Sequence, residues 1–195
     1  PPPPTAVGLI AAGGRLPVLV AEGLRERGHP VHGLGLSGMY EPELRHLCDT
    51  FRTIGLLRVG TWGPTLRRIG VKPAIMVGKV DKAKLMHDPF KLVRHLPDLR
   101  TLRVWYRDLR HDRRSYAVLK AIADELDRNG VSLIDSTAPI PDQIATAGTM
   151  TRRQPTPEQQ ADIEFVWPLL TETLRLHSAP AISVRDRHVL AAHAL

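Results

Sequence analysis

A glycine pair between an apolar run and an amphipathic segment is the part of the sequence best suited to bind a charged ligand. Residues 7–12 carry no charge and predict a strand that is buried on both faces. Gly13 and Gly14 would allow a sharp turn and a close approach of the backbone to a ligand. Pro17 is compatible with the first turn of a helix predicted over residues 18–27. Because free N–H groups and the helix dipole attract anions, we predict a phosphate or nucleotide site here.

The glycine spacing differs from a dinucleotide fingerprint. Gly8, Gly13 and Gly14 do not form G-x-G-x-x-G. No acidic residue stands at the end of the expected second strand, about twenty residues on, where it would hold a ribose hydroxyl. A nicotinamide dehydrogenase is therefore disfavoured. A glycine turn that only closes a strand–helix unit remains an alternative.

Basic residues in two further loops are candidates for phosphate contacts. Lys79 and Lys82 follow an apolar run that ends at Val77, and Thr151 and Arg152 lie in an irregular, proline-rich stretch. A guanidinium can make paired hydrogen bonds to a phosphate, and a lysine supplies a compact positive charge. Solvated surface side chains are the alternative in both loops.

Arginines between residues 98 and 114 recur at steps of three and four, which places them on one face of a helix. They are Arg100, Arg103, Arg107, Arg110 and Arg114. Such a stripe suits phosphate or an anionic lipid surface, and a solvated face paired with nearby aspartates is the alternative.

Several other classes of site are disfavoured. The single cysteine, Cys48, allows no internal disulfide, and its apolar neighbours predict a buried side chain. His111-Asp112 lacks the further ligands of a metal phosphohydrolase, and His188 and His193 are poorly spaced for a metal. No P-loop, zinc pattern or serine elbow is present. The net charge of +7 favours anionic partners, but aromatics make up only 5% of the chain, which disfavours a stacking platform for single-stranded nucleic acid.

The order of elements predicts an α/β protein. Gly28, Gly70 and Gly130 each follow a helix-like stretch and precede an apolar run. Repeated helix, glycine and strand is typical of a mostly parallel, Rossmann-like sheet with helices on both faces. Further elements are expected as a strand at residues 53–57, helices at 62–69, 115–129 and 158–176 (the last either interrupted at Pro168 or started late there), and a hairpin at 181–192.

We expect three regions along the chain. Residues 1–5 form a disordered, proline-rich start, residues 6–140 the Rossmann-like domain, and residues 141–195 the start of a smaller α+β domain. Because an apolar run is still in progress at Leu195, we expect that domain to be incomplete.

Four stretches together resemble one family, the LpxI-type UDP-2,3-diacylglucosamine pyrophosphatases, in the same order along residues 7–195. They are G-L-I-A-A-G-G-R-L-P at residues 8–17, M-V-G-K-V at 76–80, Asp112 with the helix 115–129, and A-G-T-M-T-R-R-Q-P-T at 147–156 with Asp162.

The resemblance implies a reaction and a site. The family cleaves the pyrophosphate of its substrate with Mg²⁺ and releases UMP and 2,3-diacylglucosamine 1-phosphate for lipid A synthesis. It implies a cytoplasmic enzyme associated peripherally with the inner membrane, with no nucleic-acid partner; a homodimer is left open. The residues expected to contact the substrate are Gly13, Gly14, Lys79, Asp112, Thr151 and Arg152.

Two departures from the family pattern leave a second function open. His193 stands at the first glutamate of the family's A-x-E-A-x-E-G-T-D segment, and residues 176–181 lack the Asp, Gly and Gln of L-D-I-G-Q-A. The catalytic acid is thus expected to be missing from these 195 residues. The alternative is a non-catalytic module that binds a nucleotide-sugar or an anionic lipid.

Overall fold

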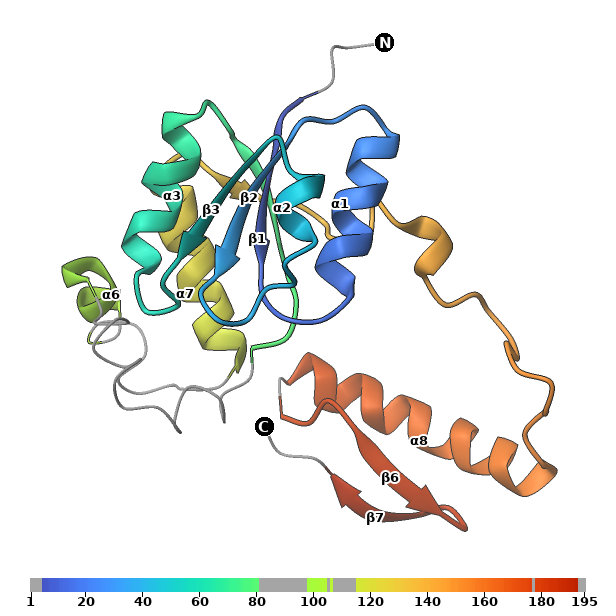
Figure 1. Ribbon diagram of the computed structural model, residues 1–195. Helices are drawn as coiled ribbons and strands as arrows, with labels where there is room; N and C mark the ends of the chain where they lie inside the picture. Colours follow the sequence, from blue (N-terminus) through green and yellow to red (C-terminus); the bar gives the residue numbers. More distant parts are fainter. Residues whose placement is uncertain (1–4, 81–97, 105, 107–114, 177, 193–195) are drawn as a thin grey trace. The chain divides into compact units, whose positions relative to one another are not determined.

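The computed structural model describes residues 5–80, 98–104, 106, 115–176 and 178–192 (Figure 1). Contacts between residues divide the chain into two compact units. The larger unit comprises residues 1–113 and 117–144, and the smaller one comprises residues 114–116 and 145–195.

The larger unit is built on a five-stranded parallel sheet with the order β3-β2-β1-β4-β5. The strands are β1 (Val7–Ala11), β2 (Val31–Leu36), β3 (Thr50–Ile54), β4 (Pro73–Val77) and β5 (Ser132–Leu133). β1 is fully buried because strands flank it on both sides and helices cover both faces. The predicted Rossmann-like fold class is therefore confirmed.

Alternate side chains of the sheet enter two separate cores. Leu9 and Ala11 join a cluster with α1 (Leu16–Glu26) and α2 (Leu44–Leu47). Ile10 and Ala12 join a second cluster with α3 (Val59–Arg68) and α7 (Ser115–Asp127). Figure 1 shows these two helix pairs on opposite faces of the sheet, with the short α6 (Leu99–Val104) beside α3. Successive side chains of β1 point to opposite faces of the sheet, so they alternate between the two cores.

The sequence prediction for one edge strand of the sheet is wrong. The third strand occupies Thr50–Ile54 instead of residues 53–57, because an edge strand with mostly exposed side chains lacks an apolar run to mark it. β5 pairs only with Pro73 and Ala74, so it ends well before β4 does. The chain after β5 then reaches the C-terminal end of α1, where the Arg27 guanidinium donates to the Pro139 carbonyl.

The smaller unit consists of α8 (Pro157–Arg175) and an antiparallel hairpin of β6 (Ile182–Arg185) and β7 (His188–Ala192). Thr156 and Gln159 form a reciprocal capping box that starts α8. The predicted break at Pro168 is wrong: the helix continues through it, because Pro168 is exposed and water can satisfy the carbonyl that loses its partner. A short 3₁₀ turn, η2 (Pro141–Gln143), precedes this unit.

Asp162 fixes the hairpin turn against α8. Its carboxylate accepts the backbone N–H of Arg187 at 2.6 Å and that of Asp186 at 3.2 Å. Both turn residues have positive φ, which leaves these N–H groups pointing to one side. Asp162 therefore has a structural role within the smaller unit.

Cys48 is buried in the core beneath α2, as predicted. Burial raises the pKa of its thiol to about 11, with a further contribution from the nearby Asp49 carboxylate. We expect the intact protein at pH 8 to react with a thiol-specific disulfide reagent about 100-fold more slowly than free cysteine, because far less thiolate is present. Stopped-flow absorbance measures this rate, and urea-unfolded protein is the control. Equal rates in folded and unfolded protein would contradict the buried position.

Candidate functional site

The carboxyl ends of β1 and β4 meet at the point where the chain changes direction across the sheet. The chain passes from β1 through α1 to β2 and β3 on one side, and then returns through α3 to β4 on the other. Ligands of open parallel sheets bind at such a switch point, just outside the strand ends. The loops after β1 and β4 are therefore the first place to look for a site.

A short backbone bridge joins these two loops. The Gly13 N–H donates to the Lys79 carbonyl at 3.0 Å, and the Lys79 N–H donates to the Gly13 carbonyl at 2.8 Å. The Gly13 N–H is therefore bonded within the protein and is not one of the free N–H groups near the start of α1. Gly13 can thus offer close backbone approach, and the bridge fixes Lys79 beside the start of α1.

Gly14 supplies the exposed turn into α1. Its φ is +95°, and a side chain there would meet no atom within 4 Å, so the space beside it is open. α1 begins at Leu16 with Arg15 as N-cap, and no side chain caps the helix. The first turn thus leaves room for an anion, and the predicted phosphate site there stays a prediction.

Two acidic side chains approach this turn from the segment after β2. Glu41 Oε1 lies 3.4 Å from the Gly14 nitrogen, and Glu43 Oε2 lies 3.3 Å from Arg15 Nη1. Neither glutamate was predicted from the sequence, because the ribose-binding acid of a dinucleotide fold is expected directly at the end of β2. A turn that starts at Leu36 and passes through Gly38 lengthens the loop and delivers the acids later. The signal that could have located them is a glycine-containing turn followed by Glu41-Pro42-Glu43.

Tyr40 anchors this loop to the sheet. Its hydroxyl hydrogen-bonds Thr53 at 3.0 Å and also accepts from Arg45, whose guanidinium lies 5.4 Å from the ring centroid. The ring packs against Phe51 with centroids 4.9 Å apart. The Thr53 hydrogen bond and the Arg45 charge lower the pKa of Tyr40, against the opposing effect of partial burial. The loop that holds Glu41 is therefore supported by packing and hydrogen bonds.

Glu41 occupies the side of Gly14 where an anion would bind. We expect Glu41→Gln to tighten the binding of inorganic pyrophosphate about two- to fivefold, because a competing charge at the helix start is removed. Isothermal titration calorimetry measures the affinity. Glu26→Gln, at the exposed far end of α1, makes the same change of charge and should leave the affinity unchanged. Weaker binding by Glu41→Gln would instead mean that Glu41 contacts the ligand.

The structure brings together three of the predicted substrate-binding residues: Gly13, Gly14 and Lys79. The Lys79 residue is exposed. Thr151 and Arg152 lie in the smaller unit, where Thr151 donates to the Arg153 carbonyl at 2.9 Å and both side chains are exposed. Asp112 and Lys82 lie outside the described residues. The roles of all these side chains stay predictions.

The described residues do not by themselves provide a metal site. Among them, no group of three or more His, Cys, Asp or Glu side chains is placed to hold an ion. Glu41 and Glu43 lie near the glycine turn but are engaged with Gly14 and Arg15. The expected Mg²⁺ therefore stays a prediction with no ligands assigned. In the same part of the chain, no helix is both long and apolar enough to cross a bilayer.

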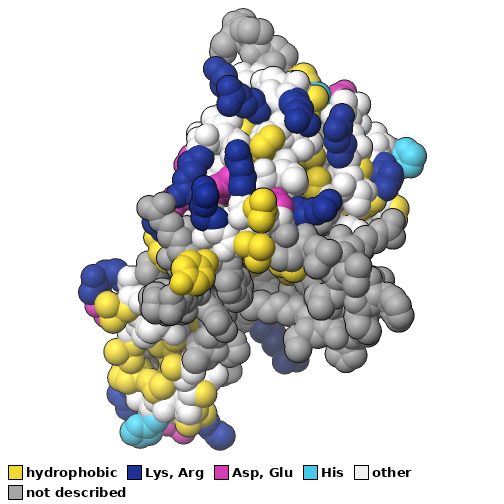
Figure 2. Space-filling model, turned by 90° about the vertical axis from the view of Figure 1, so that its left-hand side faces the viewer, with side chains coloured by type: hydrophobic (Ala, Val, Ile, Leu, Met, Phe, Trp, Pro, Cys, Tyr) yellow, Lys and Arg dark blue, Asp and Glu magenta, His cyan; other side chains and the backbone are white. Residues whose placement is uncertain are grey.

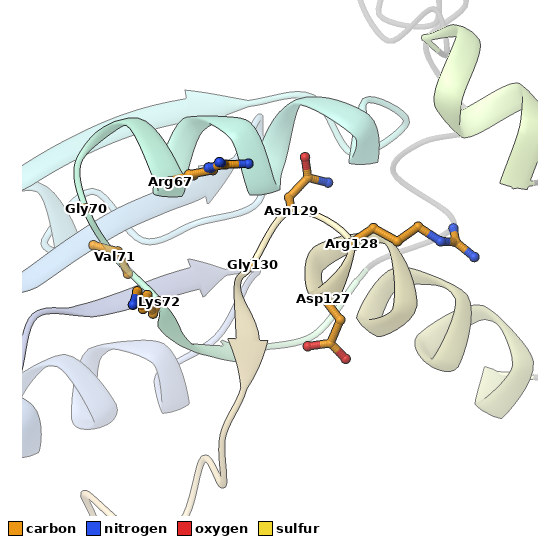
Figure 3. Close-up of a pocket in the computed structure, with 8 residues that line it drawn as sticks. All are labelled: Arg67, Gly70, Val71, Lys72, Asp127, Arg128, Asn129 and Gly130. Carbon is orange, nitrogen blue, oxygen red and sulfur yellow. The ribbon is translucent and has the colours of Figure 1, made fainter.

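A pocket of about 480 Å³ lies at the opposite, amino edge of the sheet (Figure 3). It is lined where α3 and α7 end, by Arg67, Gly70, Val71, Lys72, Asp127, Arg128, Asn129 and Gly130. Helix carboxyl ends carry partial negative charge, which explains basic side chains there without a ligand. Its Asn129 amide donates to the Glu125 carbonyl at 2.7 Å and so is already partnered. We assign no chemistry to this pocket.

Comparison with known families identifies the family of this chain. A model described as the LpxI N-terminal domain matches residues 6–143, a range that includes the whole parallel sheet. A search of curated proteins found no match.

Solved structures give distant matches. The protein gox2253 is 18% identical with a TM-score of 0.41, over 65% of this chain and 32% of that chain. The enzyme WbmH from Bordetella bronchiseptica, in complex with NAD+, is 17% identical with a TM-score of 0.39, over 66% and 53%. A UDP-glucose-4-epimerase from Stenotrophomonas maltophila, with bound NAD and formylated UDP-arabinopyranose, is 11% identical with a TM-score of 0.39, over 87% and 49%. The chain thus spans between about a third and about half of these solved chains.

Proposed function

Because the chain belongs to the LpxI family, whose N-terminal domain it contains at residues 6–143, we propose that it hydrolyses UDP-2,3-diacylglucosamine. The products are UMP and 2,3-diacylglucosamine 1-phosphate. Water adds its oxygen to one phosphorus as the anhydride bond breaks, and the other phosphate leaves with the bridging oxygen. Family membership supports a role in the lipid A pathway, and the precise reaction is the proposal.

The Gly13–Lys79 bridge is the observation that most supports a pyrophosphate ligand. It holds a lysine beside the uncapped start of α1, at the switch point of the sheet. A pyrophosphate gains negative charge on the leaving oxygen during hydrolysis, and positive groups fixed beforehand stabilise that charge. Lys79 and the first turn of α1 would supply such groups from the larger unit. Thr151 and Arg152 belong to the smaller unit, and their substrate contacts stay predictions from the family resemblance.

Mg²⁺ is part of the proposal on the basis of the family resemblance alone. When bound, a divalent ion would neutralise pyrophosphate charge. The described carboxylates form no cluster for it, so its ligands are unassigned.

The test is the release of UMP from UDP-2,3-diacylglucosamine dispersed in detergent, with Mg²⁺ and with EDTA. Binding of UDP to the same preparation is measured in parallel by calorimetry. Release of UMP supports the hydrolase, and its loss in EDTA supports the metal requirement. Binding of UDP without UMP release would indicate the non-catalytic binding module. If the protein shows no UDP binding and no UMP release, a nucleotide-sugar function is overturned altogether.

A further inference from the structure

The outer face formed by α3, α6 and α7 has a surplus of positive charge. Four of its exposed cations form no ion pair with any described residue, and three others have acidic partners. Figure 2 shows this side of the larger unit, where Lys and Arg side chains greatly outnumber Asp and Glu. We call it the basic face. Its unpaired cations are Arg67, Arg68 and Arg103 on the helices and Lys72 in the segment between α3 and β4, and its paired ones are Arg100, Lys120 and Arg128.

The opposite face of the same sheet does not share this surplus. α1 with its C-cap, α2 and the loop between β2 and α2 carry four cations and four acids, so their charges balance. The cations there are Arg15, Arg25, Arg27 and Arg45. The acids there are Glu22, Glu26, Glu41 and Glu43. The positive charge is therefore concentrated on one side of the unit and is not spread evenly over its surface.

Large aliphatic side chains are exposed on the basic face. Leu99 and Leu102 lie one turn apart on α6 and are 85% and 48% exposed, and Leu119 on α7 is 52% exposed. Exposed aliphatic groups of this size lose the stabilisation that burial would give. Their position among cations is typical of a surface that meets both charged headgroups and acyl chains.

The leucines of α6 are displayed by an anchored helix. Arg100 Nη1 lies 3.3 Å from the Glu125 carboxylate of α7, which is only 7% exposed and also pairs with Arg128. Asp98 accepts the Thr101 N–H at 2.6 Å and so caps α6. Because Arg100 is held by buried partners, the exposure of Leu99 and Leu102 is built into the packing of α6 against its neighbours.

We propose that the basic face docks onto an anionic lipid bilayer, with Arg67, Arg68, Lys72 and Arg103 at the headgroups and Leu99, Leu102 and Leu119 in contact with the acyl boundary. Each basic side chain near an anionic membrane strengthens binding by roughly fivefold. A nucleic acid would also attract the cations, but its phosphates and bases give no use for exposed leucines. The proposal does not depend on the proposed hydrolysis, although a lipid-bearing substrate would be reached from such a surface.

The test is co-sedimentation of the full chain with vesicles, either of phosphatidylcholine alone or with phosphatidylglycerol as about one third of the lipid. We expect binding to the anionic vesicles only. The triple variant Arg67→Gln/Arg68→Gln/Lys72→Gln should weaken it on the order of 100-fold. The pair Leu99→Ser/Leu102→Ser should weaken it at least about tenfold. Arg25→Gln/Arg153→Gln, which removes exposed charges outside the basic face, is the control and should have a much smaller effect.

Three outcomes would overturn the proposal. The first is no binding to anionic vesicles, and the second is an equal loss of vesicle binding in the triple variant and the control. The third is vesicle binding that the leucine substitutions do not change, together with equally strong binding of the chain to duplex DNA. The last result would assign the face to general polyanion binding. Circular dichroism of each variant checks that it is folded. UMP release from substrate in detergent needs no vesicle, so failure of this proposal and failure of the proposed hydrolysis can be told apart.

Discussion

Replacing Gly78 with alanine is expected to lower the free energy of unfolding by about 2–4 kcal/mol and to disrupt the candidate site. Gly78 has φ of +113°, outside the range that side-chain-bearing residues adopt readily. A methyl group there would lie 2.8 Å from the backbone carbon of Ala12. Neither backbone can move without disturbing the hydrogen bonds that join the ends of β1 and β4. The added methyl should therefore also weaken the Gly13–Lys79 bridge.

Gly70→Ala is the matched control for this substitution. Gly70 also has positive φ, +77°, but a side chain there would meet no atom within 4 Å. The Gly70→Ala substitution should lower the free energy of unfolding by only about 1–2 kcal/mol, because alanine must adopt the left-handed backbone conformation there. Urea unfolding followed by circular dichroism gives both values, and calorimetry with UDP reports the site. Equal losses of stability in the two variants would show that the close contact between Gly78 and Ala12 has no energetic consequence.

The sequence predicted the interior of the larger unit well, because burial leaves a pattern in the residues. The uncharged residues 7–12 became β1, which has strands on both sides. Gly28, Gly70 and Gly130 have positive φ after α1, α3 and α7, as the helix–glycine–strand repeat required. At these positions local backbone chemistry and the global fold demand the same residue.

The prediction failed where burial gives no signal. β3 is an edge strand with Thr50, Arg52 and Thr53 exposed, so no apolar run marks its start. Pro168 predicts a break by local rules, yet on the exposed surface of α8 the helix continues. In both cases the solvent-exposed environment outweighed the local propensity.

The candidate site was only partly predictable for a related reason. The position of Gly13 and Gly14 follows from a strand–turn–helix pattern that is local in sequence. The approach of Glu41 depends on a turn after β2 and on the packing of Tyr40, and neither has a fixed sequence spacing. The bond between Gly13 and Lys79 joins residues brought together only by the parallel pairing of β1 and β4. Long-range pairing of this kind cannot be read from spacing along the chain.

Lys79→Gln is expected to reduce UMP release about 100-fold and to weaken UDP binding about tenfold or more. The backbone of Lys79 is fixed by its bridge to Gly13, so the substitution removes the charge and leaves the loop in place. The loss in rate should exceed the loss in affinity, because a fixed positive charge stabilises the charge that develops as the anhydride bond breaks. Lys79→Arg keeps the charge and should recover part of the activity.

Lys72→Gln is the matched control for Lys79→Gln and also tests the other candidate location. Lys72 lines the pocket at the amino edge of the sheet, where α3 and α7 end. If the nucleotide binds at the carboxyl edge, Lys72→Gln leaves UDP binding unchanged, since soluble UDP needs no contact with a membrane. If Lys72→Gln weakens UDP binding and Lys79→Gln does not, the nucleotide binds in the amino-edge pocket, and the switch-point assignment is wrong. Comparable losses in both variants would point to net charge alone, because two opposite edges of one sheet cannot both contact a single UDP.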